Sequence, residues 1–298
     1  MFPVNAQHGS STRIPDAAAG DPVPAQCAEG HAEEGRWASM TVAEIVALVG
    51  LALPEEVARV DAAFAVRRVR AGETLHRTGD TFKSIDIVRS GFFKTTALDQ
   101  VGDELVIGFP MVGDVVGIDA IDSGRYLAET VALDMSSVVT IPFTQLARLG
   151  QEHPGIERIM YALFSRELAH THAMCSLLGT MGAESRLATF LIETSERFGR
   201  LGCSRNAFTL RATRQEIGSY LGLKLETVSR TLSSFAAAGL IAIDRRDVCL
   251  HDCAELRRIA SGAGTQAAKT ASARRNAREV QARLAAVPLR GAAHALAA

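Results

Sequence analysis

Hydrophobic positions follow different periods in different parts of the chain. Between about residues 64 and 142, short apolar or alternating runs such as "SIDIVRSGFFKTTAL" and "AETVALDMSSVVTIPF" are separated by Gly and Asp. Short strands joined by Gly-rich turns are typical of a β-sandwich or β-barrel. Together with a short helical segment at about 42–51, they predict a β-barrel domain over residues 37–150.

From residue 154 onward the period becomes helical, and the apolar residues of 154–181 form two neighbouring stripes. One stripe can pack on the chain's own barrel, which leaves the other, with its heptad spacing, for a second helix. We therefore predict a dimerisation helix over 151–181, while burial of both stripes inside one subunit stays open as the alternative. The predicted dimer seam has successive spacings of three and four and consists of Tyr161, Phe164, Leu168, Thr171, Cys175 and Leu178.

Residues 182–260 contain two helical patterns joined by a glycine and followed by two strand patterns. Thr213 is suited to begin the first helix as its N-cap, and Gly222 permits a tight turn. A second helix is predicted over 225–238, and "LIAIDRRDVCLHD" predicts two strands around a charged turn. Together these elements predict a winged helix-turn-helix. The positions of the second helix expected to face inward are Val228, Leu232 and Phe235.

Polar residues gather at the start of this second helix, since its spacing leaves Glu226, Ser229 and Arg230 on the solvent-facing side. In helix-turn-helix proteins this end of the second helix enters the major groove of DNA. Arg can donate two hydrogen bonds, to O6 and N7 of guanine, and Glu can accept one from the amino group of cytosine. Ser can form a hydrogen bond with a base or a phosphate. A lone Glu and Arg on a helix usually form a solvated ion pair, but the turn, the wing and the apolar spacing together favour DNA reading.

Motifs along most of the chain resemble those of a known family. They are "GETLHRTGD", "IVRSGFFK", "GDVVGIDAI", "TIPF" and "TRQEIGSYLGLKLETVSRTLSSFAAAGLI". Over residues 42–260 the sequence resembles the Crp/Fnr family of bacterial transcription regulators, and it is most similar to the Fnr branch. The resemblance implies an α+β chain with an N-terminal cyclic-nucleotide-binding-like jelly-roll barrel, a long dimerisation helix and a C-terminal winged helix-turn-helix.

The same resemblance implies a homodimer that binds a palindrome in double-stranded DNA, of the type TTGAT-N4-ATCAA. The positions that match the family's base-reading residues are Glu226, Ser229 and Arg230. Those that match contacts with the DNA backbone are Thr213, Lys224 and Thr227. The resemblance also implies contact with RNA polymerase, for which the turn "LDQVGDELV" at residues 98–106 is the candidate.

Departures from the family pattern bear on cofactors. Where cyclic AMP receptors carry a phosphate cassette, Asp119 replaces the Glu and Arg125 is followed by Tyr126, which disfavours cyclic AMP. An iron-sulfur cluster is usually held by four thiolates. The segment 1–36 has only Cys27, and Val139 stands at the matching barrel position, which disfavours the cluster. No cofactor is therefore predicted.

Haem stays open, through His76, His153 or His170. The alternative function is accordingly a small-molecule or haem-sensing module whose barrel ligand controls the output. Redox chemistry at Cys175, or at Cys249 and Cys253, also stays open, although free Cys is most often a small buried apolar residue. No metal site is predicted, because the usual paired cysteine spacings do not occur in duplicate.

Composition and the lack of certain motifs limit the classes of protein to which the chain can belong. The chain has 298 residues, 47% of them hydrophobic, and a net charge of -1. No nucleophile and base, phosphate-binding loop or metal triad has convincing spacing, so an enzyme is not predicted. The sequence has no apolar run of about 18 residues and no signal pattern, from which we expect a cytoplasmic protein without membrane contact. A leader at 1–36 and an Ala/Arg-rich tail at 261–298 are expected to be disordered.

Overall fold

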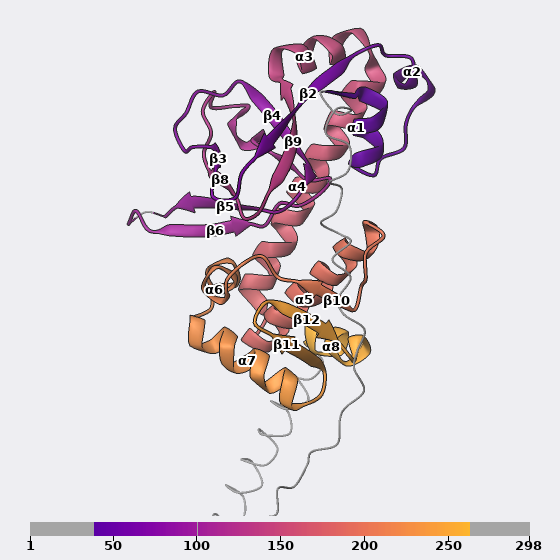
Figure 1. Ribbon diagram of the computed structural model, residues 1–298. Coiled ribbons are helices and arrows are strands. Elements are labelled where there is room, and N and C mark those ends of the chain that lie inside the picture. The colour runs from indigo at the N-terminus through magenta and orange to yellow at the C-terminus, as the bar shows by residue number, and fades with distance from the viewer. Residues whose placement is uncertain (1–38, 100, 263–298) are drawn as a thin grey trace, which may run out of the picture.

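The computed structural model describes residues 39–99 and 101–262. The leader 1–36 and the tail beyond residue 262 lie outside these residues, so their expected disorder stays a prediction. Figure 1 shows a β-rich part, a long helix that leads away from it, and a smaller part made mainly of helices. This arrangement confirms the α+β architecture expected from the sequence.

The β-rich part is formed by two antiparallel sheets, as in a jelly roll. The five-stranded sheet has the order β1-β2-β9-β4-β7, and the four-stranded sheet has the order β3-β8-β5-β6. The strands are β1 (Ser39–Thr41), β2 (Ala63–Val69), β3 (Thr74–His76), β4 (Ser84–Ser90), β5 (Phe93–Leu98), β6 (Glu104–Gly108), β7 (Val115–Val116), β8 (Glu129–Ala132) and β9 (Ser136–Pro142).

Alternation along the strands separates two apolar layers. In the central pair β4 and β9, Ile87 lies opposite Val139, and both pack in the cluster that contains the neighbouring helices. The next residue on β4, Val88, and its partner Val138 belong to the interior cluster instead. This is expected because successive side chains of a strand point to opposite faces. The helices of this part are α1 (Val42–Leu48), α2 (Glu55–Ala58), the 3-10 helix η2 (Ile118–Ala120) and α3 (Phe143–Glu152).

The long helix α4 (Pro154–Thr180) connects the barrel with the C-terminal part. It begins at Pro154, and proline is favoured in the first helical turn because no N–H is required there. Helix α5 (Ala183–Arg200) follows after a short turn. Arg186 holds this junction together, since its guanidinium donates to the carbonyl oxygens of Leu178 at 2.6 Å, Met181 at 2.9 Å and Leu221 at 2.9 Å.

The C-terminal part is a winged helix-turn-helix. Its three-stranded sheet has the order β10-β12-β11, so the wing contains one strand more than the sequence predicted. Its apolar core extends into the barrel, because Val106 and Met111 belong to the same cluster. No helix in the described residues has both the length and the apolar character needed to cross a bilayer. The elements are β10 (Ala207–Thr209), α6 (Arg214–Leu221), α7 (Leu225–Ala237), β11 (Ile241–Asp244), β12 (Asp247–Leu250) and α8 (Cys253–Ala260).

Candidate nucleic-acid interface

A capping box fixes the start of α6, as expected for Thr213. The Oγ1 of Thr213 accepts from the N–H of Glu216 at 3.2 Å, and a carboxylate oxygen of Glu216 accepts from the N–H of Thr213 at 2.8 Å. The Thr213 hydroxyl also lies 2.9 Å from that carboxylate oxygen, to which it donates. The hydroxyl and the backbone N–H of Thr213 are therefore both used inside the helix start.

Two glycines shape the turn between α6 and α7. Gly222 ends α6 with φ 61° and ψ 40°, a left-handed conformation that glycine adopts without strain. Gly218 allows close approach, because a Cβ there would lie 2.7 Å from the carbonyl oxygen of Leu223. The N–H of Leu223 in turn donates to the carbonyl of Gly218 at 2.8 Å. The angle between the two helices thus depends on small residues at both positions.

Helix α7 presents one apolar face and one polar face. Val228, Leu232 and Phe235 are buried, as the spacing predicted. Of the residues matched to base reading, Glu226 and Arg230 are exposed and Ser229 is half-buried. Glu226 and Arg230 are one turn apart, yet no ion pair joins them in the described part of the chain. Their charged groups are available to a partner.

The residues matched to backbone contacts lie around the same end of the helix. Lys224 is the N-cap residue of α7, and its side chain is exposed. Thr227 is half-buried in the first turn of α7, and Thr213 is exposed at the start of α6. The structure therefore brings all six sequence-matched residues to the starts of α6 and α7.

Three arginines that the sequence analysis did not assign also border this surface. They surround a hollow of about 200 Å³ between the start of α6 and the tip of the wing. Arg245 and Arg246 form the two-residue turn between β11 and β12, and Arg245 has φ 53°. Arg214 is the first residue of α6. The sequence signal of Arg245 and Arg246 was the charged turn "DRRD", which gave no indication that the turn would face the start of α6.

The barrel is docked on α6 through its β5–β6 hairpin. Lys94 Nζ lies 2.9 Å from Glu216 Oε1, and both side chains are about four-fifths buried, with 21% and 19% exposure. The N–H of Val106 donates to Ser219 Oγ at 3.0 Å. Burial raises the pKa of Glu216, but hydrogen bonds from Thr213 and Lys94 lower it by more, so the pKa lies below its ordinary value. One carboxylate thus serves both the helix start and the docking of the barrel.

Two further arginines hold the domains together. Arg197 on α5 pairs with the carboxylate of Asp114 and donates to the carbonyl of Phe109 at 3.3 Å. Arg211, just before α6, lies 3.3 Å from Asp134. Phe109 also packs edge-on against Tyr220, with 5.2 Å between ring centroids. These contacts were missed because the sequence alone did not place the two domains against each other.

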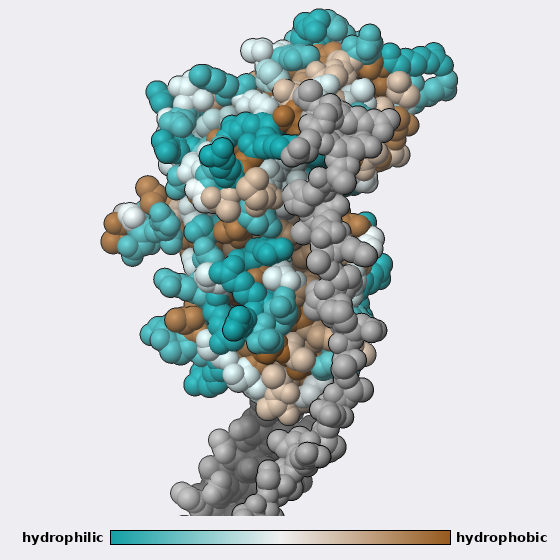
Figure 2. Space-filling model, in the orientation of Figure 1, coloured by the Kyte–Doolittle hydropathy of each residue, from teal (hydrophilic) through white to brown (hydrophobic). Residues whose placement is uncertain are grey.

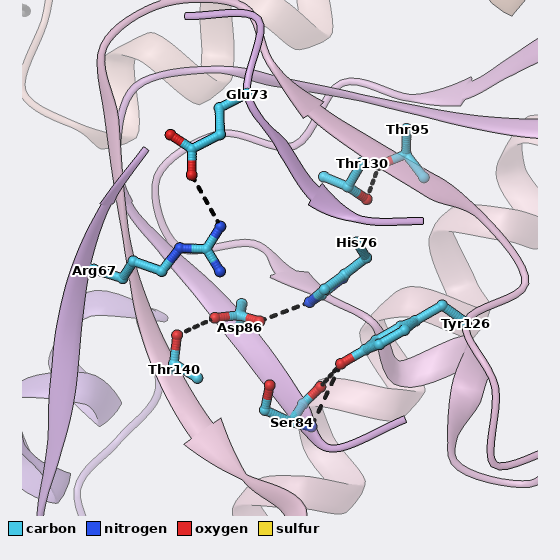
Figure 3. Close-up of polar contacts among 9 residues, drawn as sticks. All are labelled: Arg67, Glu73, His76, Ser84, Asp86, Thr95, Tyr126, Thr130 and Thr140. Atoms are coloured by element: carbon cyan, nitrogen blue, oxygen red, sulfur yellow. Dashed lines mark hydrogen bonds and ion pairs between the residues drawn. The ribbon is translucent and has the colours of Figure 1, made fainter. Parts of the chain in front are cut away.

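The barrel interior, where cyclic nucleotide receptors hold their ligand, contains a stack of the chain's own rings (Figure 3). His76 and Tyr126 stack with 4.0 Å between centroids and 12° between planes. His76 Nε2 lies 2.7 Å from Asp86 Oδ2, and Thr140 donates to the other oxygen of Asp86. Tyr126 donates through its hydroxyl to the carbonyl of Ser84 at 2.8 Å. The polar groups in this space therefore form their hydrogen bonds with one another.

The charged residues at the positions of the phosphate cassette, Asp119 and Arg125, also form hydrogen bonds within the chain. Arg125 donates to the carbonyl of Gly79 at 2.7 Å, and Asp119 accepts from the N–H of Leu127 at 3.0 Å. Val139 is fully buried in β9.

The remaining candidates for metal, haem or redox chemistry are two histidines and three cysteines. His153 is the N-cap of α4, and His170 Nε2 lies 3.5 Å from the Tyr220 hydroxyl. Within the described ranges, no three His, Cys, Asp or Glu side chains are grouped as metal ligands. Cys175 is an exposed free thiol, and Cys249 and Cys253 are half-buried free thiols.

The two stripes of α4 differ in their surroundings. Met160 and Leu163 pack on the barrel cluster, and Met174, Leu177 and Met181 pack on the cluster of the C-terminal part. The described residues leave the other stripe largely uncovered, with 61% exposure at Tyr161 and 56% at Leu168. Its other members, Phe164, Thr171, Cys175 and Leu178, are half-buried or exposed.

Comparisons with known proteins agree with both halves of this architecture. Residues 66–153 match the model of the cyclic nucleotide-binding domain, and residues 185–259 match that of the Crp-like helix-turn-helix domain. The chain is 38% identical over 205 residues to the transcriptional regulatory protein btr of Bordetella pertussis, which covers 68% of this chain and 85% of that protein. It is 40% identical over 197 residues to the transcriptional activator protein FnrA of Stutzerimonas stutzeri, covering 66% of this chain and 81% of that protein.

Among solved structures, FixK2 from Bradyrhizobium japonicum is similar with a TM-score of 0.60 and 26% identity. The similarity covers 65% of this chain and 96% of that chain. The family models and the relatives agree with the fold and with the helix-turn-helix surface described above. The chain therefore belongs to the Crp/Fnr family of transcription regulators, within its Fnr-like branch.

Proposed function

We propose that this regulator binds, as a homodimer, a palindromic DNA site of the type TTGAT-N4-ATCAA and contacts RNA polymerase from that site. The observation that carries the proposal is the polar face of α7. Glu226 and Arg230 are exposed there without an ion pair between them in the described structure, while the opposite face of the helix is locked in the core. Charged groups held in this way at the start of a recognition helix fit the donors and acceptors of a G·C pair.

The basic surface around α7 supports contact with the DNA backbone. Lys224, Arg214, Arg245 and Arg246 are all exposed around the starts of α6 and α7 and the tip of the wing. Phosphate contacts from such residues position a protein on the duplex and make binding depend on salt. We assign Lys224, Thr227 and Thr213 to contacts with the DNA backbone. The hydroxyl proton of Thr213 is already donated to Glu216, so Thr213 contributes by fixing the start of α6 at this surface.

The exposed stripe on α4 supports a homodimer. Large apolar residues such as Tyr161 and Leu168 recur at heptad spacing on a helix of 27 residues, and no other part of the chain that the structure describes covers them. A second copy of α4 would bury this stripe and place two copies of α7 on two half-sites, as a palindrome requires. The assigned seam is Tyr161, Phe164, Leu168, Thr171, Cys175 and Leu178.

The tip of the β5–β6 hairpin supports a protein partner. Figure 2 shows the hairpin projecting from the molecule with hydrophobic residues at its end. Leu98 is 58% exposed and Val101 is 86% exposed. We assign this turn to contact with RNA polymerase, because its other end is anchored on the DNA-binding part through Lys94 and Val106.

Regulation without a cyclic nucleotide is part of the proposal. The His76 and Tyr126 stack occupies the position of the cassette, and Arg125 is turned to the backbone of Gly79. The apolar cavity between the barrel and α4 has a volume of only about 50 Å³. An engineered cavity that accommodates benzene has about 150 Å³, so this space does not favour haem or another ring-sized ligand.

The test is the affinity of purified protein, without added ligand, for the palindrome and for a duplex of scrambled sequence. We expect the palindrome to bind on the order of a thousandfold more tightly or better. Cyclic AMP should leave this ratio unchanged, and the protein should show no haem absorbance. Equal affinity for the two duplexes would reject sequence-specific reading, and binding that requires an added ligand would favour the sensing alternative.

A further inference from the structure

Two polar residues interrupt the inward stripe of α4 at the level where the barrel gives way to the C-terminal part. The stripe follows spacings of three and four from Met160 to Met181. Its apolar members pack on the barrel cluster at one end and on the cluster of the C-terminal part at the other end. Between them, the same spacing places Glu167 and His170. Two ionisable side chains therefore occupy the stripe where the two domains meet.

Helices α5 and α6 bring further ionisable groups to this level. His170 Nε2 lies 3.5 Å from the hydroxyl of Tyr220 on α6, and burial raises the pKa of Tyr220 to about 12, so this hydroxyl stays protonated. The Tyr220 ring packs on Phe190 of α5, with 6.1 Å between ring centroids. Glu193 follows Phe190 by three residues and so lies on the same side of α5. The junction cluster, as we call Glu167, His170, Glu193 and Tyr220, is surrounded by Glu196, Arg197 and Arg200 of α5 and by Asp114 and Asp119 of the barrel.

Two carboxylates of the junction cluster have no partner that balances their charge. Arg197 pairs with Asp114, which occupies its guanidinium on the barrel side. Among the described residues, the carboxylates of Glu167 and Glu193 accept no hydrogen bond and form no ion pair. Each is open to solvent on one side, yet burial on the other side raises its pKa, and the nearby His170 lowers it by less. Ionisation of both glutamates therefore opposes the packing of α4, α5 and α6 around them.

We propose that the junction cluster takes up protons when the C-terminal part docks on α4 and the barrel, so that acidification tightens the docked arrangement in which α7 reads DNA. This inference rests on the proposed function and names a signal to which the DNA-binding surface responds. A carboxyl that is buried without a partner binds its proton more tightly than a carboxyl in water. By linkage, the cost of ionising it is fully present above its raised pKa and disappears as pH falls from that value to the ordinary value of 4.5.

Helix α6 connects the junction cluster with the recognition helix. Tyr220 lies in the last turn of α6, two residues before Gly222, which sets the turn into α7. Its neighbour Ser219 accepts from the N–H of Val106 on the β5–β6 hairpin. Packing of Tyr220 in the junction cluster therefore helps to fix the direction in which α7 presents its polar face.

The experiment uses Glu→Gln variants, because glutamine has the shape of a protonated glutamate and carries no charge. At pH 8 and a fixed protein concentration, Glu167→Gln and Glu193→Gln, singly and together, should unfold at a higher urea concentration than the wild type. This difference should shrink as the pH is lowered to 5. Glu216→Gln should show the opposite sign, because the pKa of Glu216 is depressed. Glu104→Gln, at an exposed carboxylate of β6, is the matched control and should leave the urea midpoint unchanged at both pH values.

DNA binding gives the second measurement. At constant ionic strength, the preference of the wild type for TTGAT-N4-ATCAA over a scrambled duplex should be several-fold greater at pH 5 than at pH 8. The ratio of the two affinities removes any general effect of pH on phosphate contacts. The double variant Glu167→Gln/Glu193→Gln should show the greater preference already at pH 8 and should respond less to pH.

The outcomes separate this inference from the proposed function. Glutamine variants that are no more stable than the wild type at pH 8, or equally more stable at pH 5 and pH 8, overturn proton uptake by the junction cluster. A palindrome preference of the wild type that does not change with pH also overturns the inference and leaves the proposed function standing. If no palindrome preference exists at either pH, the proposed function falls, while the urea midpoints still decide whether the junction cluster takes up protons.

Discussion

Lys94 on β5 lies 2.9 Å from the carboxylate of Glu216, which also closes the capping box of α6. The barrel and the first helix of the DNA-binding motif therefore share one acidic group. Nearby, Val106 donates to Ser219 and belongs to the apolar cluster of the C-terminal part. The orientation of α6, and through the Gly222 turn that of α7, is thus fixed on the barrel by the chain's own side chains.

Removing Lys94 tests this docking. Lys94→Ala leaves the largely buried Glu216 carboxylate without its cation, and we expect the free energy of unfolding to fall by about 1–3 kcal/mol. Hydrogen exchange of the α6 amides should become faster, because the helix loses its support on β5. Arg59→Ala is the matched control, since its ion pair with Glu55 is well exposed, and it should cost less than about 1 kcal/mol. A Lys94→Ala protein as stable and as protected as the wild type would contradict the docking role.

The depressed pKa of Glu216 predicts a pH dependence. A carboxyl whose pKa is lower in the folded state stabilises the protein above its unfolded pKa, and this contribution disappears as pH falls through the folded value. Glu216→Gln should therefore lower the free energy of unfolding at pH 7. The difference from wild type should shrink below the ordinary value of 4.5. Urea unfolding between pH 3 and pH 7 measures it, and a difference that stays constant over this range would argue against an ionised Glu216 in the fold.

Arg230 is expected to discriminate guanine. Arg230→Ala should weaken binding to the palindrome by about 1–3 kcal/mol and should reduce the preference for guanine at that base. Fluorescence anisotropy with TTGAT duplexes and with duplexes substituted at the guanine measures both effects. Arg257→Ala, which removes an exposed arginine of α8, serves as the control. Retention of the full guanine preference by Arg230→Ala would remove Arg230 from the reading role.

Lys224 is expected to act on the backbone instead. Lys224→Ala should weaken all sequences by a similar factor, because phosphates carry no base identity. The slope of log K against log salt should become shallower by about one, which is the contribution of one released counterion. Titrations at several salt concentrations with palindromic and scrambled duplexes decide the point. A loss confined to one base position would instead make Lys224 a base reader.

The α4 stripe predicts the oligomeric state. Leu168→Glu places a charge on a residue that is 56% exposed in one chain and would be buried in the seam. We expect sedimentation to show a monomer with unchanged circular dichroism, because the residue is not part of the core of a single chain. Leu127→Glu, at a similarly exposed residue of the barrel, should leave the assembly unchanged. A dimer that persists in Leu168→Glu would place the dimer contact elsewhere.

Much of the C-terminal part could be predicted from the sequence because its signals are local. The capping residue Thr213, the left-handed Gly222 and the buried Val228, Leu232 and Phe235 each follow from short-range spacing and backbone preference. The charged turn of the wing was predicted for the same reason. Strand β10 was not, because three residues pairing with a distant strand leave too short a pattern.

Contacts between distant segments could not be predicted. Lys94 and Glu216 are more than a hundred residues apart, and nothing in either local pattern indicates the other. The same holds for Arg211 beside Asp134 and for the arginines of the wing near the start of α6. The His76 and Tyr126 stack illustrates a partial success, since the altered cassette was visible in the sequence but the ring that stacks on Tyr126 was not.

The central claim is that two copies of α7 read the two halves of one palindrome. The most direct measurement compares Kd for TTGAT-N4-ATCAA with Kd for a duplex in which one half-site is scrambled, with the number of bound chains determined on the same samples. We predict two chains per duplex and a loss on the order of a hundredfold or more when one half-site is scrambled. Equal affinity for the two duplexes, or one chain per palindrome, would contradict the account.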